Sequence, residues 1–336
     1  MKTTSYASLW IKRFLMEYLI SIRNLSKNTQ LSYRDTFRLL LPFASKRSKV
    51  SIDKLMVEDI TPEIIKAFLT EVETNRNCSL STRNQRLSAV HAFAKFVGLN
   101  SPEHVEWYRL INMVPFKKTK RTLITYLEKP EMDALLKAPE IKSEQGKRDH
   151  ALLLFLYNTG ARADEAAQLM IKDLSISSSK SNLSTVLIKG KGNKSRRCPL
   201  WQQTQKELNI LIAERDASEY VFLNRLKQPI TRFGIHNMVT RYVDLMASEN
   251  PSIKKKKVSP HTIRHTTATH LLQAGVDINT IRSWLGHVSI NTTNIYAEVD
   301  LNMKAKALAC CEVEVNTKQT THWRDKKDLM AFLDSL

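Results

Sequence analysis

The chain has 336 residues, more than one ordinary hydrophobic core needs, and 42% of them are hydrophobic, so we expect two packed domains. Only 8 glycines and 10 prolines are present, which favours mostly regular, helical structure, and no run of ~20 apolar residues could cross a membrane. Lys and Arg number 52 against 33 acidic residues, and this net charge of +19 fits a polyanionic partner, first nucleic acid and second an anionic membrane surface.

The first 112 residues predict four helices that form one helical domain. Apolar side chains recur at helical spacing in YASLWIKRFLMEYLISI and in LSKNTQLSYRDTFRLLLPFA, and the second stretch opens with a Ser or Asn cap. A third helix is expected in TPEIIKAFLTEVE, with Pro62 in the first turn after Thr61, and a fourth in SLSTRNQRLSAVHAFAKFVGL, with Gly98 as its stop. The opening MKTTSYASLWIKRF lacks the apolar stretch of a signal peptide, so a cytoplasmic protein is expected.

Residues 113–125 read as a basic linker between domains. A proline in this stretch is followed closely by four cations, Lys117, Lys118, Lys120 and Arg121. Such a charge run is commonly a solvated surface, but between two basic domains it could equally follow a phosphate backbone.

Residues 126–336 predict a second domain, made of helices with one small β-hairpin. KPEMDALLKAP predicts a short helix, and RDHALLLFLYNTGARADEAAQLMI predicts two helical stretches joined near Thr159 and Gly160. In LSTVLIKGKGNKSRRCPL a β-branched run ends at Gly190, and a tight turn leads into a second extended segment. A helix in HTIRHTTATHLLQAG is expected to end at Gly275. The fold class is therefore mainly α with a small β-hairpin.

The histidines of SPHTIRHTTATHLL first raise the question of a metal site. His261 and His265 are four residues apart, as in a zincin helix, but Thr262 stands where that motif requires Glu, and Arg264 is a permanent cation beside them. No C-x-x-C pair occurs among the four cysteines either. We therefore expect no metal.

Packing explains part of the same helix. His265 and His270 are expected to be buried histidines tied to backbone groups. His261 and Arg264 are explained less well by packing, because they lie three residues apart just after Ser259, at a helix start, where phosphate is attracted.

Five motifs occur in an order that resembles a known family. TGARADEAAQL, KGKGNKSRRCPL, SPHTIRHTTATHLL, WLGH and NTTNIYAEV together resemble the catalytic domain of the tyrosine recombinases, or phage integrase family, most closely its Xer-like members. LSKNTQLSYRDTFRLLLPF and STRNQRLSAVHAFAKFV resemble that family's helical, SAM-like core-binding domain. The resemblance implies a core-binding domain at 1–112, the linker at 113–125, and a catalytic domain at 126–336. The apolar stripe in WRDKKDLMAFLDSL could pack on its own domain, the usual outcome for such a stripe, but the resemblance implies a C-terminal helix that is passed to a neighbouring subunit.

The resemblance also implies a set of catalytic residues at the positions that match the family's motifs. They are Arg162, Lys191, His261, Arg264, His287 and Tyr296. Glu165, one helical turn after Arg162, matches the acidic residue that supports the first arginine. Two positions depart from the family pattern: Ala161 stands where a larger apolar residue is common, and Asp164 where Ser is frequent.

These residue types suit strand cleavage that conserves bond energy. The Tyr296 oxygen can attack a phosphodiester, release a 5′-hydroxyl and hold the 3′-phosphate as an ester, so rejoining needs neither ATP nor another cofactor. Two guanidiniums can stabilise the charge on the phosphate oxygens. Lys191 can protonate the departing oxygen as general acid. His261 is expected to assist proton movement at the tyrosine or bind a phosphate oxygen, and His287 to donate a hydrogen bond to phosphate.

The expected partner is double-stranded DNA, held in a clamp of both domains. In the first domain STRNQR offers side chains for phosphates or base edges, namely Thr82, Arg83, Asn84 and Arg86. The resemblance further implies a homo-tetramer on synapsed DNA sites, a monomer or dimer when free, no membrane association, and a cytoplasmic, nucleoid-associated place in a bacterium. The implied role is integration, excision, transposition or resolution of a mobile element or replicon.

Three other functions stay open at this point. A type IB topoisomerase uses similar chemistry but would relax supercoils rather than join two DNA sites. An architectural or regulatory DNA-binding protein with a dead active site would form no covalent adduct with DNA. A metal-dependent nuclease or transposase would lose its activity in EDTA.

Overall fold

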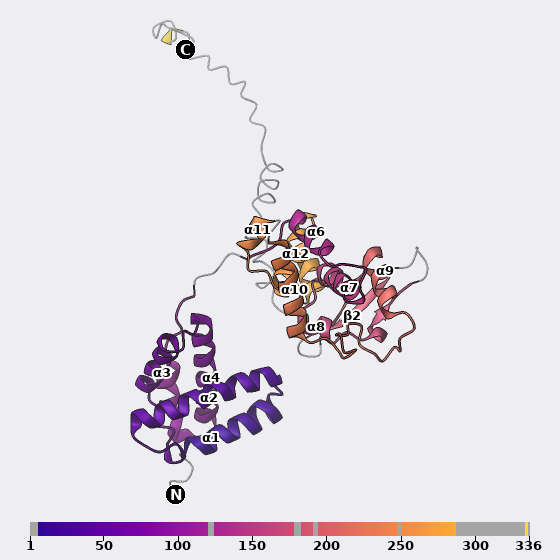
Figure 1. Cartoon of the computed structure of the whole chain (residues 1–336). Helices are drawn as coiled ribbons and strands as arrows, with labels where there is room; N and C mark the ends of the chain where they lie inside the picture. The colour runs from indigo at the N-terminus through magenta and orange to yellow at the C-terminus, as the bar shows by residue number, and fades with distance from the viewer. Residues whose placement is uncertain are drawn as a thin grey trace. The chain divides into compact units, whose positions relative to one another are not determined.

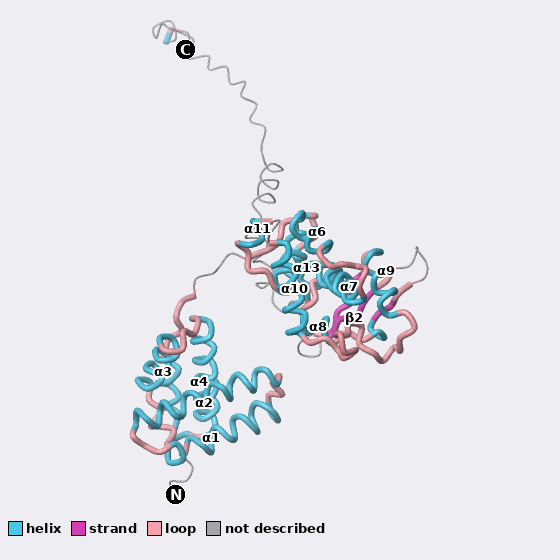
Figure 2. The backbone as a smooth tube through the Cα atoms, viewed as in Figure 1, coloured by secondary structure: helices cyan, strands magenta, loops and turns pink. Residues whose placement is uncertain are grey.

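The computed structural model describes residues 6–119, 124–177, 183–190, 194–247, 250–286 and 333–334. The chain divides into two compact units, Met1–Thr122 and Leu123–Leu336 (Figure 1). Each unit has a hydrophobic core of its own. This division falls inside the predicted linker 113–125, whose limits stay a prediction. Figure 2 shows helices in both units. The strands found in the described residues all lie in the second unit. This arrangement confirms the mainly α fold class. Within these described ranges, no helix has the length and apolarity to cross a membrane.

The first unit is helical along most of its length, and polar caps start its longer helices. Its elements are α1 (Ala7–Arg13), the π-helix η1 (Phe14–Ile22), α2 (Lys27–Ser48), the 3-10 turn η2 (Ile52–Lys54), α3 (Pro62–Thr74), α4 (Leu80–Asn100), the 3-10 turn η3 (Pro102–His104) and α5 (Val105–Asn112). The Ser26, Thr61 and Ser79 side chains each accept a hydrogen bond from a backbone N–H of the first turn that follows, as N-caps do. The four predicted helices are present, and α5 is an additional one.

Gly98 was expected to end the fourth helix, and that prediction is wrong. Helix α4 continues to Asn100. A Cβ atom on Gly98 would lie 2.6 Å from the Cβ of Tyr108 in α5, so this glycine allows two helices to approach closely. The aromatic core lies nearby, with the Phe93 ring 5.2 Å from that of Phe37 and 5.5 Å from that of Phe14.

The second unit places helices around a small antiparallel sheet of strand order β1-β2-β3. Its elements are α6 (Lys129–Lys137), α7 (Glu144–Thr159), α8 (Ala163–Ala167), the 3-10 turn η4 (Ile171–Asp173), β1 (Leu174–Ser175), β2 (Thr185–Lys189), β3 (Ser195–Pro199), α9 (Gln202–Ile212), α10 (Arg232–Met246), α11 (Pro251–Lys254), α12 (Pro260–Gln273) and α13 (Ile278–Leu285). The predicted hairpin is β2–β3, paired from Thr185 with Pro199 to Lys189 with Ser195. The short strand β1 was not predicted.

Helix α7 is the centre of the second unit, because every residue from Ala151 to Thr159 is buried. It ends at Gly160, which adopts the left-handed conformation with φ +59°. A Cβ atom there would lie 2.5 Å from Leu285 Cδ2, so α13 contacts the end of α7 closely. Helix α12 also ends as predicted, with Gly275 at φ +87° two residues past its last residue.

Candidate active site

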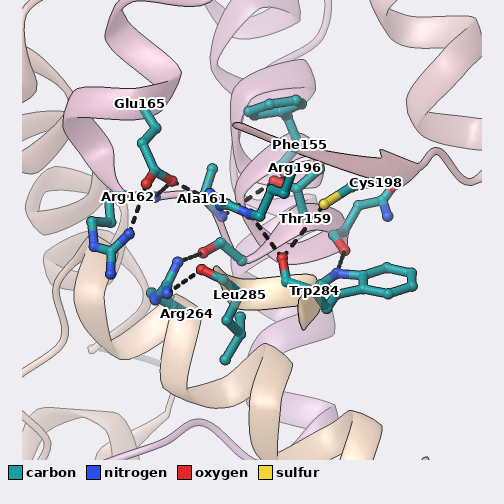
Figure 3. Close-up of polar contacts among 12 residues, drawn as sticks. Phe155, Thr159, Ala161, Arg162, Glu165, Arg196, Cys198, Arg264, Trp284 and Leu285 are labelled. Carbon is teal, nitrogen blue, oxygen red and sulfur yellow. Dashed lines mark hydrogen bonds and ion pairs between the residues drawn. The ribbon is translucent and has the colours of Figure 1, made fainter. Parts of the chain in front are cut away.

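Arg264 is a buried cation that joins the ends of two helices. Ser259 caps α12, whose second turn carries Arg264 into the interior, where the residue is 1% exposed. Its Nη1 donates to the Gly160 carbonyl at 2.5 Å and its Nη2 to the Leu285 carbonyl at 2.6 Å (Figure 3). Carbonyls at helix C-termini carry partial negative charge, so α7 and α13 both stabilise the guanidinium. Arg264 therefore fixes the end of α13 against the turn that precedes Arg162.

Arg162 lies two residues after Gly160 and starts α8 as a pair with Glu165. The Arg162 backbone N–H donates to Glu165 Oε2 at 2.9 Å, and its Nη1 donates to Oε1 at 2.7 Å. The Arg162 side chain is 41% exposed, whereas that of Glu165 is 5% exposed. One carboxylate thus orients a guanidinium that still reaches solvent, where a ligand can contact it.

Glu165 keeps its charge because a second arginine faces it. Arg196 Nη2 donates to Glu165 Oε2 at 2.8 Å, and the Arg196 side chain is 9% exposed. Burial alone would raise the pKa of Glu165, but the hydrogen bond and charge of Arg196 and the two Arg162 donors outweigh it and lower that pKa. A carboxylate between two guanidiniums results.

His261 is the neutral member of the group. It lies in the first turn of α12 and stays partly accessible to solvent, with its ring centroid 4.4 Å from that of His265 in an edge-to-face arrangement. Partial burial of the ring, and then the charges of Arg264 and Arg162, lower its pKa. The imidazole is therefore neutral at neutral pH, the form that can accept a proton.

The two departures from the family pattern fit their surroundings. Ala161 is 1% exposed and its N–H donates to Thr159 Oγ1 at 3.2 Å, so this position is part of the core. Asp164 is exposed on α8 and accepts from Gln168 Nε2 at 3.3 Å.

Three of the six predicted catalytic residues lie outside the described residues, namely Lys191, His287 and Tyr296. The residues that directly precede Lys191 and His287 are described, and both lie at the site formed by Glu165 and Arg196. Gly190, just before Lys191, donates its N–H to the Lys194 carbonyl at 2.7 Å, and a Cβ atom on it would lie 3.2 Å from Glu165 Oε1. Gly286, just before His287, ends α13 with φ +65°.

No metal centre is indicated in the part of the chain that the structure describes. No group of three or more His, Cys, Asp or Glu side chains there could hold a metal ion. His270, expected to bond to the backbone, has Nδ1 at 2.7 Å from the Tyr157 hydroxyl, and a backbone hydrogen bond with Leu127 also acts on the pKa of its ring. His265 and His270 are half-buried rather than fully buried.

Family comparisons cover both units. The model of the phage integrase family matches residues 125–303, and that of the phage integrase N-terminal SAM-like domain matches residues 11–98. The chain belongs to the phage integrase family.

Two relatives show how far the likeness of this integrase-family chain extends. It is 36% identical over 337 residues to a protein named integrase/recombinase y4rC of Sinorhizobium fredii, covering 99% of this chain and 100% of that protein. It is 27% identical to the tyrosine recombinase XerC of Bacillus subtilis, over 87% of this chain and 92% of that one. The chain is a tyrosine recombinase of the Xer-like kind, a DNA strand-exchange enzyme of site-specific recombination.

Solved structures show the same fold. The recombinase XerH, bound to a palindromic difH substrate in a post-cleavage complex, matches with a TM-score of 0.67 at 23% identity, over 87% of this chain and 82% of that one. The Tn1549 transposon integrase in complex with a circular intermediate DNA matches with a TM-score of 0.65 at 16% identity, over 89% of this chain and 99% of that one.

In the first unit of the recombinase, several residues predicted to bind DNA contact the protein itself. Asn84 Nδ2 donates to the Lys117 carbonyl at 2.8 Å, and the Lys117 N–H donates to Asn84 Oδ1 at 3.1 Å. Arg83, 6% exposed, donates from Nη1 to the Pro115 carbonyl at 3.3 Å, and Lys117 Nζ lies 2.7 Å from Glu73. We call this set, residues 83, 84, 115 and 117, the linker clasp, because it fixes residues 115–117 to α4.

The remaining residues predicted to contact DNA have varied surroundings. Thr82 Oγ1 lies 3.0 Å from the hydroxyl of the cap Ser79, Arg86 is half-buried, and Lys118 is exposed. Lys120 and Arg121 lie outside the described residues. DNA binding by all of these residues stays a prediction.

Arg196 is the residue of the recombinase site that the sequence analysis missed. A strand has a period of two, and Arg196 precedes the buried Cys198 by two residues, so both face the interior. An arginine on the inner face of a short strand needs a buried acceptor. The two-residue spacing from Arg196 to Cys198 was therefore the sequence signal that could have identified Arg196.

Proposed function

We propose that this recombinase cleaves and rejoins duplex DNA through a 3′-phosphotyrosyl intermediate, with Tyr296 as nucleophile. The Tyr296 oxygen attacks phosphorus and its proton passes to neutral His261. The bond from phosphorus to the 5′-oxygen breaks, and Lys191 protonates that oxygen as it leaves. Reversal of these steps with the 5′-hydroxyl of another strand rejoins the DNA.

One observation carries this proposal: Arg264 holds the turn that presents Arg162. The Gly160 carbonyl that Arg264 binds is two residues before Arg162, whose guanidinium remains 41% exposed. Both guanidiniums would donate to the non-bridging oxygens of the phosphate, and His287 would add a further hydrogen bond. Removing one such preorganised donor typically lowers the rate about 10²–10³-fold.

The proposed partner is double-stranded DNA, as the related structures bound to DNA support. The net charge of +19 favours binding to phosphates. Contacts from residues 82–86 and from the linker cations, a tetramer on synapsed sites, and exchange of the C-terminal helix at 324–336 are parts of the same proposal. The cellular role we propose is movement or resolution of a mobile element or replicon.

The test is covalent capture on DNA. A binding site is first selected from random-sequence duplexes with the full chain, and a nicked form of it serves as suicide substrate in EDTA. We expect a detergent-stable adduct with the wild type and none with Tyr296→Phe, which should still bind the duplex. An adduct with the Phe variant, or no adduct with the wild type, contradicts the proposal. Relaxation of supercoils without joining of two marked sites would indicate a topoisomerase instead.

A further inference from the structure

Arg196 connects three parts of the site through two hydrogen bonds. From the inner face of β3, its Nη2 donates to Glu165 Oε2 at 2.8 Å and its Nε to the Trp284 carbonyl at 2.8 Å (Figure 3). Glu165 in turn holds Arg162, and Trp284 is in the last turn of α13. The strand pairs with β2, and Lys191 lies between these two strands in the sequence.

The surroundings of the guanidinium are shaped to fit it. A Cβ atom on Gly286 would lie 3.1 Å from Arg196 Cδ and 3.2 Å from Nη1, and one on Gly190 would lie 3.8 Å from Nη1. These two glycines directly precede His287 and Lys191. Side chains at either place would crowd Arg196 or Glu165, so the chain passes close to the guanidinium just before it reaches both predicted catalytic residues.

The end of α13 is held by two arginines from different elements. The consecutive carbonyls of Trp284 and Leu285 accept from Arg196 and Arg264 respectively. Arg196 therefore ties α13 to Glu165 and Arg162, whereas Arg264 ties it to the turn before Arg162. Together the two arginines fix the place at which the chain leaves α13 toward His287 and Tyr296.

We infer that Arg196 is a positioning residue for DNA cleavage: its bridge from Glu165 to the Trp284 carbonyl sets Arg162 and the end of α13 in register. This inference rests on the proposed function. Only an arginine fits, because the two donors lie along one planar edge and reach a carboxylate and a carbonyl at once, which the single ammonium of a lysine does not do.

The experiment compares Arg196→Gln with Arg215→Gln. Arg215 is a matched control, because it too pairs with a carboxylate, Glu219 at 3.2 Å, and donates to a carbonyl, that of Val221 at 3.1 Å. These two partners are not residues of the candidate active site. Single-turnover cleavage is measured at saturating suicide substrate, with the affinity for the intact duplex measured separately. We expect Arg196→Gln to cleave about 10- to 100-fold more slowly at nearly unchanged affinity, and Arg215→Gln to keep the wild-type rate.

A double variant tests the route through the carboxylate. If Arg196 acts through Glu165, Arg196→Gln lowers the rate much less in a Glu165→Gln background than in the wild type. Equal losses in both backgrounds, an unaltered rate for Arg196→Gln, or an equal loss in Arg215→Gln would each overturn the inference.

Backbone hydrogen exchange of the free protein gives a readout that needs no DNA. We expect Arg196→Gln to speed exchange in the last turn of α13 and at Arg162, and Arg215→Gln to leave both unchanged. If the wild type forms no adduct, the proposed function fails, and the exchange result still decides whether Arg196 joins these elements. Unchanged exchange in Arg196→Gln would refute the bridge.

Discussion

Glu165→Gln tests whether the shared carboxylate holds the site together. Three donors meet its two oxygens: the Arg162 N–H and Arg196 Nη2 at Oε2, and Arg162 Nη1 at Oε1. A glutamine offers one acceptor oxygen. It keeps more bonds when that oxygen takes the Oε2 place, and its NH₂ group then faces Arg162 Nη1. Because the Arg162 side chain is 41% exposed, it can turn to solvent, whereas Arg196 cannot.

The expected cost is therefore partly structural and partly catalytic. Removing one partner of a buried ion pair costs about 3–5 kcal/mol, and we expect the low end, near ~3 kcal/mol, since one hydrogen bond to Arg196 survives and the exposed Arg162 contributes little. For a unit of this size that lowers Tm by roughly 6–12 °C. Cleavage should slow about 10- to 100-fold, because Arg162 loses its fixed orientation.

The assay is thermal unfolding together with single-turnover cleavage, and Asp164→Asn is the matched control. Asp164 is the exposed neighbour on α8, so its variant removes the same charge without touching either arginine. Equal losses of Tm or of cleavage rate in the two variants would refute a specific role of Glu165 in holding the two arginines, because the loss of one negative charge would then explain both results.

Two further predictions concern His265 and Asn84. Burial, and then the charges of His261 and Arg264, lower the pKa of His265 to about 4, below its unfolded value of about 6.5, so its stabilising contribution is complete above pH ~6.5 and is lost as the pH falls toward 4. In His265→Gln, the free energy of unfolding should fall less steeply across this window, and equal slopes in chemical denaturation would count against that pKa. Asn84→Ala removes the acceptor of the Lys117 N–H, so exchange of that amide should speed up about tenfold, whereas Gln85→Ala, whose side chain bonds to Ser32, should leave it unchanged. Slow Lys117 exchange in Asn84→Ala would argue against the linker clasp.

The order and type of most elements follow from local sequence signals. Helix caps and stops bond to backbone groups only a few residues away, as at Ser26, Thr61, Ser79 and Gly275. A short stretch of sequence therefore contains both partners of each such interaction. Gly98 looked like the same kind of stop. Its actual role, close approach to Tyr108, depends on a helix that packs across from it, and no local pattern reveals such a contact.

The candidate active site also contains contacts that are local in sequence and contacts that only the folded chain makes. Arg162 and Glu165 are three residues apart, so their pairing could be expected from sequence, and the structure has it at 2.7 Å. The partners of Arg196 lie 31 and 88 residues away, and only tertiary packing brings them together. Asn84 likewise has contacts that no local pattern reveals, because both its amide atoms bond to Lys117, 33 residues away.

The burial of these cations decides where catalysis can be separated from folding. Arg264 is 1% exposed and holds two helix ends, so a substitution there removes part of the core of the unit as well as the proposed phosphate contact. Slow DNA cleavage by an Arg264 variant could therefore arise from a disturbed core as well as from a lost phosphate contact. Arg162 differs, because its backbone N–H is bound to Glu165 whatever its side chain, and its guanidinium reaches solvent. Arg162→Lys keeps the charge and the helix start while it removes the forked donor. A loss of rate at unchanged stability in that variant would be a loss of phosphate contact itself.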